Sequence, residues 1–490
     1  MKKYILTILA IIICASSGSM RAENVGVPAE CEDVMLQAFY WDSYDLSKNT
    51  TKYGCTRWLY LAKDSAVLGE YFDLVWLPPC SQSTGGVGYY HVQLSNLTSD
   101  WGNRQGLNKL IASLHRRGTK VIGDIVINHR GSVNGWCSFA SDNFGTYGSY
   151  QLTSKHVCTY DECFTDSRSD WYNKPLSSRG GADTGTNDGG ARDLDHSSEY
   201  VQNWAKAYTQ WMRNTVQFDG FRYDMTRGYS GEYLKMYNEA SNPYFSVSEC
   251  WAGIDEVVAH LKATNYSTLE FDFPLKENIK TAFVNGSYTK LKKSNTGTLS
   301  GRGLNRYAVT FIDNHDMFER PETDACNQEF PSCNANLSDA TVKNQILQAN
   351  AYILMMPGVP CVFWPHWKSY TDEIKELIAL RKRAGIHSES VVTEEKANPK
   401  TYSGTIQGHK YKVVLRLGRS RSKEVPAGYE LALEGGDRGD YTIFIETGTG
   451  VENVQRDKTP STKVLRDGKL YIQVGEKTYD IMGRELTEAR

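Results

Sequence analysis

The sequence lacks several features that would place it in other classes of protein. Basic and acidic residues nearly balance, at 55 and 57 of 490, and no long run of one sign suggests a nucleic-acid partner or an acidic tail. Beyond the first residues, no segment approaches the ~20 consecutive apolar residues that a transmembrane segment needs. No CxxC pair or histidine cluster has the spacing of a zinc site. We found no internal repeat or low-complexity tract.

The chain begins with the three-part pattern of a secretory signal peptide. Two lysines precede an apolar stretch from Tyr4 to about Cys14, and small residues follow up to Ala22. This pattern predicts removal of residues 1–22 and a mature chain that is secreted, periplasmic or held at the cell surface. Lipidation of Cys14 stays open, although the isoleucines before it offer no small residue at the usual cleavage point.

Ten of the eleven cysteines remain once Cys14 is removed with the signal peptide, and export permits disulfides. The nearest pairs lie in loop-like stretches: Cys158 with Cys163, and Cys326 with Cys333. Cys250 and Cys361 lie in strand-like apolar runs, where we expect buried free thiols.

Eight short apolar runs of strand length alternate with helix-like stretches. The runs are 34–41, 72–77, 120–127, 218–225, 245–251, 269–275, 307–312 and 359–364. Eight strands separated by helices predict an α/β fold, a closed (β/α)8 TIM barrel rather than an open sheet. One connecting helix can be checked by its period, because Leu107, Leu110, Ile111 and Leu114 fall on one face before the chain enters the third strand.

A long segment after the third strand interrupts this alternation. Residues 130–196 are rich in Gly, Ser, Asp and Tyr and show no sustained period. So long a stretch in a compact domain is usually functional or a small subdomain. We therefore predict a catalytic barrel over residues 23–387 that is interrupted by a loop subdomain at 130–196.

The pattern changes again near the C-terminus, over residues 388–447. Alternating strands are expected at 405–417, 429–433 and 441–446. They predict a C-terminal antiparallel β domain. A further hairpin, with Asp467-Gly468 as its turn, lies in the tail 448–490.

Three carboxylates follow three different predicted strands. Asp224 comes at the end of the fourth strand, Glu249 of the fifth and Asp316 of the seventh. In a (β/α)8 barrel, polar residues at the carboxyl ends of the strands line the active-site mouth. Glycoside hydrolysis with retention needs a nucleophilic carboxylate and a carboxylic acid about 5 Å apart. Each residue alone fits a helix cap or a solvated loop better, but their order along the chain favours catalysis.

Four strings at these strand ends carry a family resemblance. They are DIVINH (124–129), GFRYD (220–224), SVSE (246–249) and FIDNHD (311–316). Together they resemble the four signature regions of the α-amylase family of glycoside hydrolases, and the chain is most similar to plant-type members over roughly residues 33–446. The resemblance implies endo-hydrolysis of α-1,4-glucosidic bonds in starch, glycogen and malto-oligosaccharides with retention of configuration, by a monomer. Two alternatives stay open: an exo-acting maltooligosaccharide-forming amylase and a non-catalytic starch-binding protein.

The resemblance also implies a role for each matching residue. Asp224 would be the nucleophile, Glu249 the general acid/base, and Asp316 the carboxylate that orients the substrate. Six further residues would bind substrate: Trp41, Tyr89, His129, Arg222, Arg227 and His315. Tyr89 would stack on the sugar at the cleavage point, and Arg222 would keep Asp224 ionised by charge pairing.

A calcium site is implied by the same resemblance. Asn128, Asp183 and Asp193 match side-chain ligands, and Thr186 and Gly228 match carbonyl donors. Calcium prefers six to eight oxygen ligands and tolerates irregular geometry. Without the resemblance, this stretch would be interpreted as a polar, glycine-rich loop. With it, a bound Ca²⁺ is expected to fix the loop after the third strand to the barrel.

Some positions depart from the plant-type pattern. His91 stands where those sequences have Pro, and the loop after Asp316 is longer. These differences leave the predicted chemistry intact but leave the product length undetermined. Residues 451–490 fall outside the resemblance and are similar to short C-terminal tails of some secreted bacterial proteins, which implies a sorting role.

Overall fold

The computed structural model describes residues 25–47, 53–85, 87–186, 190–318, 342, 345–436 and 438–448, together with the strands between 461 and 486. The predicted signal peptide, and Cys326 with Cys333, therefore lie outside the described residues. The chain forms two compact units, Met1–Ile445 and Glu446–Arg490. The first unit contains the barrel and the larger C-terminal sheet, and the second contains only short strands.

Eight parallel strands close into a barrel, as the sequence predicts. In barrel order after β1 (Met35–Gln37) they are β14 (Val359–Phe363), β13 (Ala308–Thr310), β12 (Leu269–Phe271), β11 (Phe245–Ser248), β10 (Gly220–Tyr223), β5 (Lys120–Ile125) and β2 (Leu74–Leu77). Each strand lies inside one of the eight predicted runs. Because β1 pairs with both β14 and β2, the sheet closes on itself.

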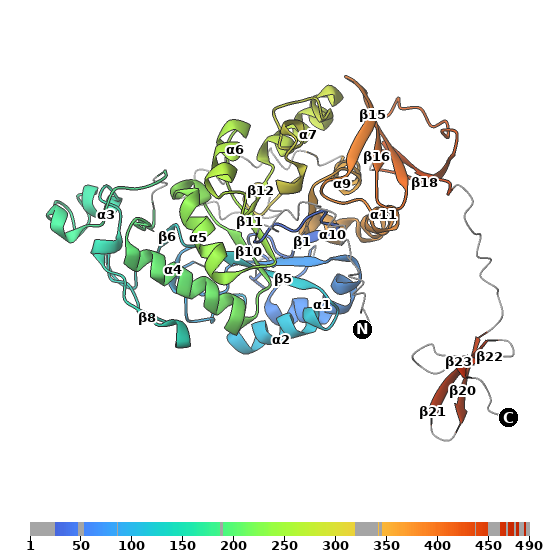
Figure 1. The fold of residues 1–490 in the computed structure, drawn as a ribbon. Coiled ribbons are helices and arrows are strands. Elements are labelled where there is room, and N and C mark those ends of the chain that lie inside the picture. Colours follow the sequence, from blue (N-terminus) through green and yellow to red (C-terminus); the bar gives the residue numbers. More distant parts are fainter. Residues whose placement is uncertain are drawn as a thin grey trace, which may run out of the picture. The chain divides into compact units, whose positions relative to one another are not determined.

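Helices surround the barrel on its outer side (Figure 1). They are α1 (Trp58–Tyr71), α2 (Arg104–His115), α4 (Glu199–Trp211), α5 (Gly231–Ser241), α6 (Ile254–Ala263), α7 (Phe273–Val284), α9 (Ile346–Met355), α10 (Trp364–Ser369) and α11 (Thr371–Ala384). Helix α2 confirms the periodicity argument, because its four predicted apolar residues are buried and the Asn103 side chain caps its first turn. None of the helices that the structure describes is long and apolar enough to cross a membrane.

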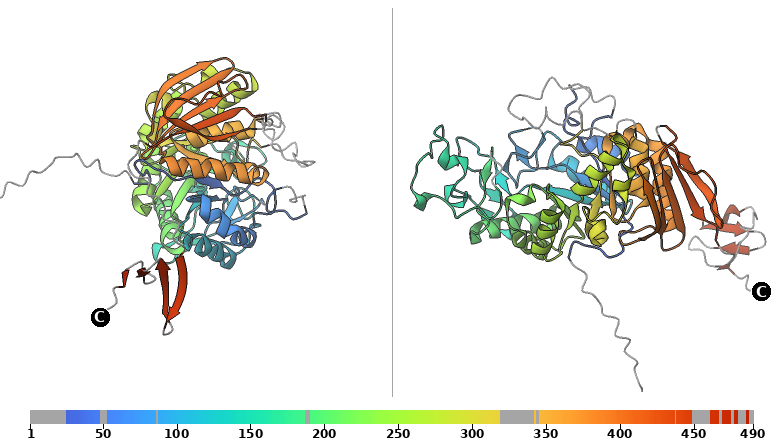
Figure 2. Two further views of the ribbon diagram at one scale, coloured as in Figure 1. Left: turned by 90° about the vertical axis from the view of Figure 1, so that its right-hand side faces the viewer. Right: turned by 90° about the horizontal axis from the view of Figure 1, so that it is seen from above.

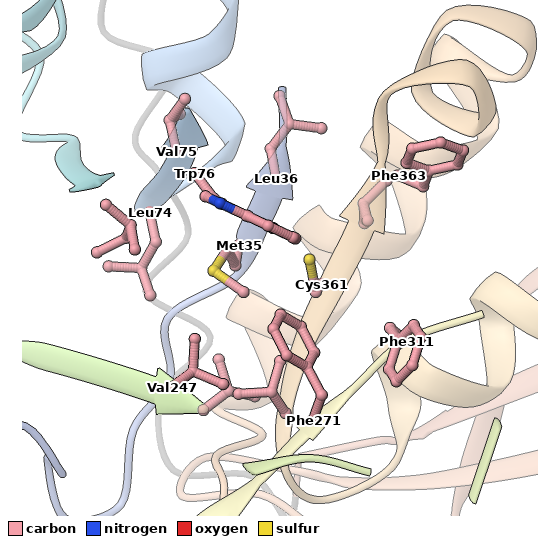
Figure 3. Close-up of a cluster of buried hydrophobic side chains, with 14 of the residues drawn as sticks. Met35, Leu36, Leu74, Val75, Trp76, Val247, Phe271, Phe311, Cys361 and Phe363 are labelled. Carbon is pink, nitrogen blue, oxygen red and sulfur yellow. The ribbon is translucent and has the colours of Figure 1, made fainter. Parts of the chain in front are cut away.

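The interior of the barrel is packed with apolar side chains. Met35, Trp76, Phe271 and Cys361 lie together between neighbouring strands (Figure 3). The Trp76 and Phe271 rings are 5.5 Å apart between centroids. The indole N–H of Trp76 donates to Asp124 Oδ2 at 3.1 Å, so the apolar core directly supports a polar group above it.

The segment 130–196 folds into short pieces rather than a structureless loop. These are β6 (His129–Arg130), β7 (Asp142–Asn143), η1 (Gly145–Tyr147), β8 (Ser149–Tyr150), η2 (Ser154–His156), α3 (Glu162–Thr165), η3 (Leu176–Ser178) and β9 (Arg192–Asp193). Within its unit, this segment lies at the end opposite the C-terminal sheet (Figures 1 and 2). A buried ion pair of 2.7 Å joins Arg130 to Asp142, which also accepts from the Trp204 indole of α4. That network ties the segment to the barrel.

The disulfide in this segment differs from the nearest-pair expectation. Cys163 is bonded to Cys137, not to Cys158. Cys158 is instead a buried free thiol, because its backbone N–H pairs with the Asp193 carbonyl and draws the residue towards β9. Cys250 and Cys361 are buried and free, as predicted.

A five-stranded antiparallel sheet follows α11. Its order is β15 (Val391–Asn398), β16 (Thr401–Gln407), β17 (Lys412–Leu417), β19 (Tyr441–Glu446) and β18 (Tyr429–Gly435). The single strand predicted over 405–417 is wrong, because the chain turns at Gly408 between β16 and β17. The prediction also missed β15, a largely exposed edge strand whose central residues Glu394, Glu395 and Lys396 are charged, so that it shows no apolar alternation.

The second unit is a small antiparallel sheet. Its strands are β20 (Ser461–Arg466), β21 (Lys469–Val474), β22 (Lys477–Tyr479) and β23 (Glu485–Leu486). Arg466 pairs with Lys469, which is the register that the predicted two-residue hairpin requires. The two turn residues themselves lie outside the described part of the chain.

Candidate active site

The predicted carboxylates are positioned by neighbouring strands of the barrel. Asp224 directly follows β10 and Glu249 directly follows β11, and these two strands pair in parallel. On the other side β10 pairs with β5, in a register that sets Arg222 opposite Asp124. The carboxyl ends of three adjacent strands therefore deliver one guanidinium and three carboxylates to one place.

Arg222 is the centre of this group. Its Nη1 lies 2.6 Å from Asp224 Oδ1 and 2.9 Å from Asp124 Oδ1, and its Nη2 lies 2.7 Å from Glu249 Oε1. All four side chains are buried. Burial raises the pKa of Asp224, and the pairing with Arg222 opposes that shift. The other oxygen of this carboxylate, Oδ2, is buried and accepts no hydrogen bond from any described residue.

The backbone after Asp224 takes part in the arrangement. Met225 has a positive φ of 44°, which is uncommon for a side chain of this kind. In this conformation its N–H donates to Glu249 Oε2 at 3.0 Å, and the Thr226 N–H donates to the Glu249 carbonyl at 3.2 Å. A strained residue thus fixes the orientation of the carboxylate on the next strand.

Aromatic and imidazole rings form one wall beside the carboxylates. The rings of Trp41, Tyr89 and His315 are nearly parallel, with interplanar angles of 10° to 13° and centroid distances of 5.3 to 6.1 Å. The Tyr89 hydroxyl donates to Asp124 Oδ2 at 2.9 Å, and Gln37 Nε2 lies 2.9 Å from His315 Nδ1. The positions of the Tyr89 and His315 rings are therefore fixed by hydrogen bonds to Asp124 and Gln37, which lie on barrel strands.

The remaining predicted residues lie at different distances from this group. His129 lies behind Tyr89, with Nε2 2.9 Å from the Tyr89 carbonyl oxygen. Asp316 lies 3.4 Å from His315 Nε2 with 31% of its side chain exposed. Arg227 lies further out, on η5 (Thr226–Gly228), where its guanidinium contacts the Trp251 carbonyl and Glu256. Its contacts place it with the loop after β11 rather than with Asp224.

The residues predicted to bind calcium come together where the segment after β5 meets the loop that carries Asp183 and Asp193, since the Leu194 N–H donates to the Asn128 carbonyl at 2.9 Å. Asp183 and Asp193 have carboxylate oxygens within 4.8 Å of each other and of the Cys158 sulfur. Both oxygens of Asp193 and Oδ1 of Asn128 are buried and have no hydrogen-bond donor among the described residues. Burial, reinforced by neighbouring Asp183, raises the pKa of Asp193 to about 9. Converging oxygens without donors are the arrangement that a divalent cation stabilises, so these residues fit calcium.

The two predicted carbonyl donors lie on segments next to these oxygens: Thr186 on the loop that follows Asp183, and Gly228 at the end of η5. Thr186 N–H donates to the Arg227 carbonyl at 2.9 Å, which joins the loop to η5. Gly228 packs directly on Asn128, and a Cβ there would lie 1.8 Å from Asn128 Oδ1. Only glycine allows this approach, so the amide oxygen of Asn128 is pressed against the segment that carries Gly228.

Sequence reasoning missed four residues of the site. Asp124 is the first residue of the DIVINH signature but was assigned no role. A single charged residue in an apolar strand could have indicated a site residue. Gln37 showed a similar signal in the first strand, as a neutral polar residue among apolar ones. Met225 carried none, because its strained backbone depends on the whole site. Trp251, two residues after Glu249, is 41% exposed and stacks on Phe273 with ring centroids 4.9 Å apart.

Comparison with known proteins adds to this geometry. The family described as "Alpha amylase, catalytic domain" matches residues 67–400. The chain is 32% identical to "Probable alpha-amylase 2" of Arabidopsis thaliana, over 79% of this chain and 88% of that protein. It is 26% identical to the glucan 1,4-alpha-maltotetraohydrolase of Stutzerimonas stutzeri, over 79% of this chain and 68% of that protein.

A similar fold is found among solved structures. The α-amylase from Geobacillus thermoleovorans in complex with acarbose matches with a TM-score of 0.60, covering 86% of this chain and 99% of that one at 16% identity. A γ-cyclodextrin glucanotransferase from an alkalophilic Bacillus clarkii gives a TM-score of 0.60 at 15% identity, over 87% of this chain and 71% of that one. At these identities the likeness concerns the fold.

Proposed function

Because the chain belongs to the α-amylase family of glycoside hydrolases, we propose that it is an endo-acting α-amylase that hydrolyses α-1,4-glucosidic bonds of starch with retention of configuration. The observation that carries the proposal is the bridge that Arg222 makes between Asp224 and Glu249. One guanidinium contacts both carboxylates through its two terminal nitrogens, which supports a retaining pair, whose carboxyl groups lie about 5 Å apart. An inverting pair, spaced by about 6.5 to 9.5 Å, would leave room for a water between them.

Asp224 acts as the nucleophile. Arg222 pairs with its Oδ1 and favours the ionised form, while Oδ2 has no donor among the described residues and is free to attack the anomeric carbon. The attack forms a bond from Oδ2 to that carbon and breaks the bond to the glycosidic oxygen. Water then releases the sugar, so two inversions give net retention.

Glu249 acts first as acid and then as base. Its two oxygens contact Arg222 and the Met225 N–H. To protonate the glycosidic oxygen, one carboxyl oxygen must turn from these contacts towards the substrate. After the leaving group departs, the same carboxylate removes a proton from the attacking water.

The ring wall and the outer carboxylate bind the sugar. Tyr89, with its neighbours Trp41 and His315, offers an apolar face for the sugar at the cleavage point. Asp316 accepts from sugar hydroxyls and holds the substrate against the nucleophile, whereas His129 supports Tyr89 from behind through the contact of its Nε2 with the Tyr89 carbonyl. Arg227 and the exposed Trp251 would meet the chain on the leaving-group side.

Calcium supports this site through the loop after β5. Asn128, Asp183 and Asp193 would bind Ca²⁺ by side-chain oxygens, with Thr186 and Gly228 supplying carbonyls. The unpaired buried oxygens of Asn128 and Asp193 support this assignment, and the family generally binds calcium. The ion supplies positive charge that neutralises these oxygens. It would fix the loop that borders the site and leave the reaction to Asp224 and Glu249.

We further propose that the enzyme is exported. The basic and apolar pattern of residues 1–22 supports signal-peptide cleavage, and the tail 451–490 would then direct sorting outside the cytoplasm. N-terminal sequencing of the exported protein should start near Glu23, and a start at Met1 would contradict the proposal.

The function is tested on starch with the mature chain in calcium. Wild type should rapidly abolish iodine staining and release α-anomeric oligosaccharides. Asp224→Asn should lose at least about 10⁴-fold in kcat while still binding maltooligosaccharides. Asp255→Asn, which removes an exposed carboxylate on α6, is the matched control and should keep full activity. Retained turnover in Asp224→Asn would overturn the nucleophile assignment.

An exo-acting enzyme is the second candidate, favoured by the similarity to a maltotetraohydrolase. It would reduce iodine staining slowly and accumulate one dominant product. A wild-type chain that binds starch without cleaving it would point to a binding protein instead.

A further inference from the structure

A second group of side chains with potential metal-ligand atoms lies away from the active site, where three segments of the barrel unit meet. Glu30 precedes β1, His387 lies between α11 and β15, and His409 lies in the turn between β16 and β17. Their ligand atoms lie within 4.8 Å of one another. Ser388, next to His387, accepts from the Gly358 N–H just before β14, so the group lies at the amino-terminal end of the barrel. We propose that Glu30, His387 and His409 bind a first-row divalent metal ion of the zinc type.

Backbone hydrogen bonds hold the three segments in register. Cys31 and Ser388 exchange two bonds, from Ser388 N to the Cys31 carbonyl at 2.8 Å and from Cys31 N to Ser388 Oγ at 3.0 Å. The His409 N–H donates to the Gly385 carbonyl at 2.8 Å. The ligand-bearing residues are therefore brought together by the fold before any metal binds, which lowers the entropic cost of binding.

The spacing suits tetrahedral coordination. His409 Nε2 lies 3.6 Å from Glu30 Oε2. Two ligands of a tetrahedral zinc ion, with bonds of about 2.0–2.1 Å, lie roughly 3.3–3.4 Å apart. A small movement therefore lets one ion contact both atoms. The rings of His387 and His409 stack with centroids 4.1 Å apart and an interplanar angle of 21°, so the second imidazole lies beside the first and has to tilt for its in-plane lone pair to meet the same ion.

A second carboxylate orients one of the imidazoles. Glu32 Oε1 lies 2.9 Å from His409 Nδ1, so Nδ1–H donates to Glu32 and the lone pair of Nε2 is left for a metal. Carboxylate–histidine–metal triads use this arrangement. His387 instead accepts a longer contact, 3.3 Å from the Glu389 N–H to Nδ1. If His387 bound the metal through Nε2, the ring proton would move to Nδ1, and Nδ1 could no longer accept from the Glu389 N–H.

The donor set selects the class of metal. Two imidazoles and one carboxylate suit zinc and neighbouring transition metals, whereas calcium and magnesium prefer oxygen ligands alone. His387 is buried and the other two residues are exposed, so a water can complete the coordination. Without a metal, the group would be a set of exposed ion pairs, which contribute little to stability.

Zinc binding to the calcium-saturated mature chain, without a histidine tag, tests the proposal. Wild type should bind one more zinc ion than His409→Gln and show a zinc-dependent rise in Tm that this variant lacks. Loss of the imidazole should weaken the affinity at least 100-fold, and Glu32→Gln, which removes the orienting carboxylate, should weaken it by about 10- to 100-fold. Activity on starch should not change in either variant.

A matched control is available in His115, whose Nε2 lies 2.7 Å from Asp219 Oδ2 in another partly exposed pair. His115→Gln should retain the wild-type zinc affinity. Excess calcium keeps zinc from the Asp183 and Asp193 oxygens, so the two sites are separated. The proposal is overturned if wild type and His409→Gln bind zinc equally, or if neither binds it.

Discussion

Two groups of buried carboxylates adjoin β5, and they meet the cost of burial in different ways. Asp124, Asp224 and Glu249 each contact Arg222, so the chain itself supplies the opposite charge. Asp193, in the other group, has two buried oxygens with no donor among the described residues. The first group is complete within the fold, whereas the second has the arrangement that the proposed calcium ion would complete.

Because of this difference, the contributions of the two groups to the free energy of unfolding should depend differently on the calcium concentration. The Arg222 group should be equally stable at any calcium concentration, because both signs of charge are covalently part of the chain. The Asp193 group should become more stable as calcium rises, by mass action. The side chains proposed to carry out hydrolysis, around Arg222, are therefore distinct from the side chains expected to make the stability depend on calcium, around Asp193.

The largest effect is expected from removing the positive charge of the first group. Arg222→Met leaves three buried carboxylates without their partner and should lower the free energy of unfolding by about 3–5 kcal/mol. Activity should fall as well, because Asp224 loses the charge that favours its ionised form. Chemical denaturation and starch hydrolysis measure the two effects.

A second substitution shows whether charge is the cause. Asp124→Asn removes one of the carboxylates, so it should be less harmful in the Arg222→Met background than in wild type. If Arg222→Met does not fold, Asp124→Asn alone still tests the charge, and Arg222→Lys, which keeps the charge but loses the fork of donors, tests the geometry. Strictly additive effects would show that these groups do not interact, and the comparison would fail.

An effect of intermediate size is expected from calcium. Chelation should lower Tm, and restoring calcium to about 100 times its Kd should return about 2.7 kcal/mol of stability. Asp193→Asn should remove most of this calcium-dependent part, because it removes a negative charge and an oxygen ligand. Thermal unfolding of both proteins with chelator and with calcium measures the difference.

Asp195 provides a matched control two residues away. It is also buried, but its oxygens accept from the Gly181 and Ser197 N–H groups at 2.7 and 3.0 Å. Asp195→Asn should lower stability by a similar amount with and without calcium. An unchanged calcium response in Asp193→Asn would contradict the assignment of Asp193 as a ligand.

Features encoded locally were predictable from the sequence. The eight barrel strands follow from apolar runs of the right length, and α2 follows from its helical period. The pairing of Arg222 with Asp224 also follows, because residues two apart on a strand share a face. The edge strand β15 was missed because little of it is buried.

Features that depend on distant contacts were not predictable. The register of β5 against β10 sets Asp124 beside Arg222, and no local pattern specifies it. The pairing of Cys163 with Cys137 rather than Cys158 depends on how the segment 130–196 folds. The same holds for Glu30 and His409, since metal-site spacing rules cannot detect ligands so far apart in sequence.

A buried imidazole shows a third way to meet the cost of burial, which is to stay neutral. His196 Nε2 lies 3.0 Å from the Ile127 carbonyl and Nδ1 lies 2.6 Å from the Tyr237 hydroxyl. Burial lowers the pKa of His196 to about 4. Below pH 6.5 the unfolded chain therefore takes up a proton that the folded chain refuses until about pH 4.

The smallest effect is predicted from this difference. The free energy of unfolding should fall as pH drops from 6.5 towards 4, by up to about 1.4 kcal/mol per pH unit from His196. His196→Gln removes that part, so the wild type's advantage over the variant at pH 7 should shrink by about 2 kcal/mol at pH 5. Urea unfolding at the two pH values measures it. Parallel losses in both proteins would mean that His196 titrates alike in the folded and unfolded chains, and that neutrality is not how this residue meets the cost of burial.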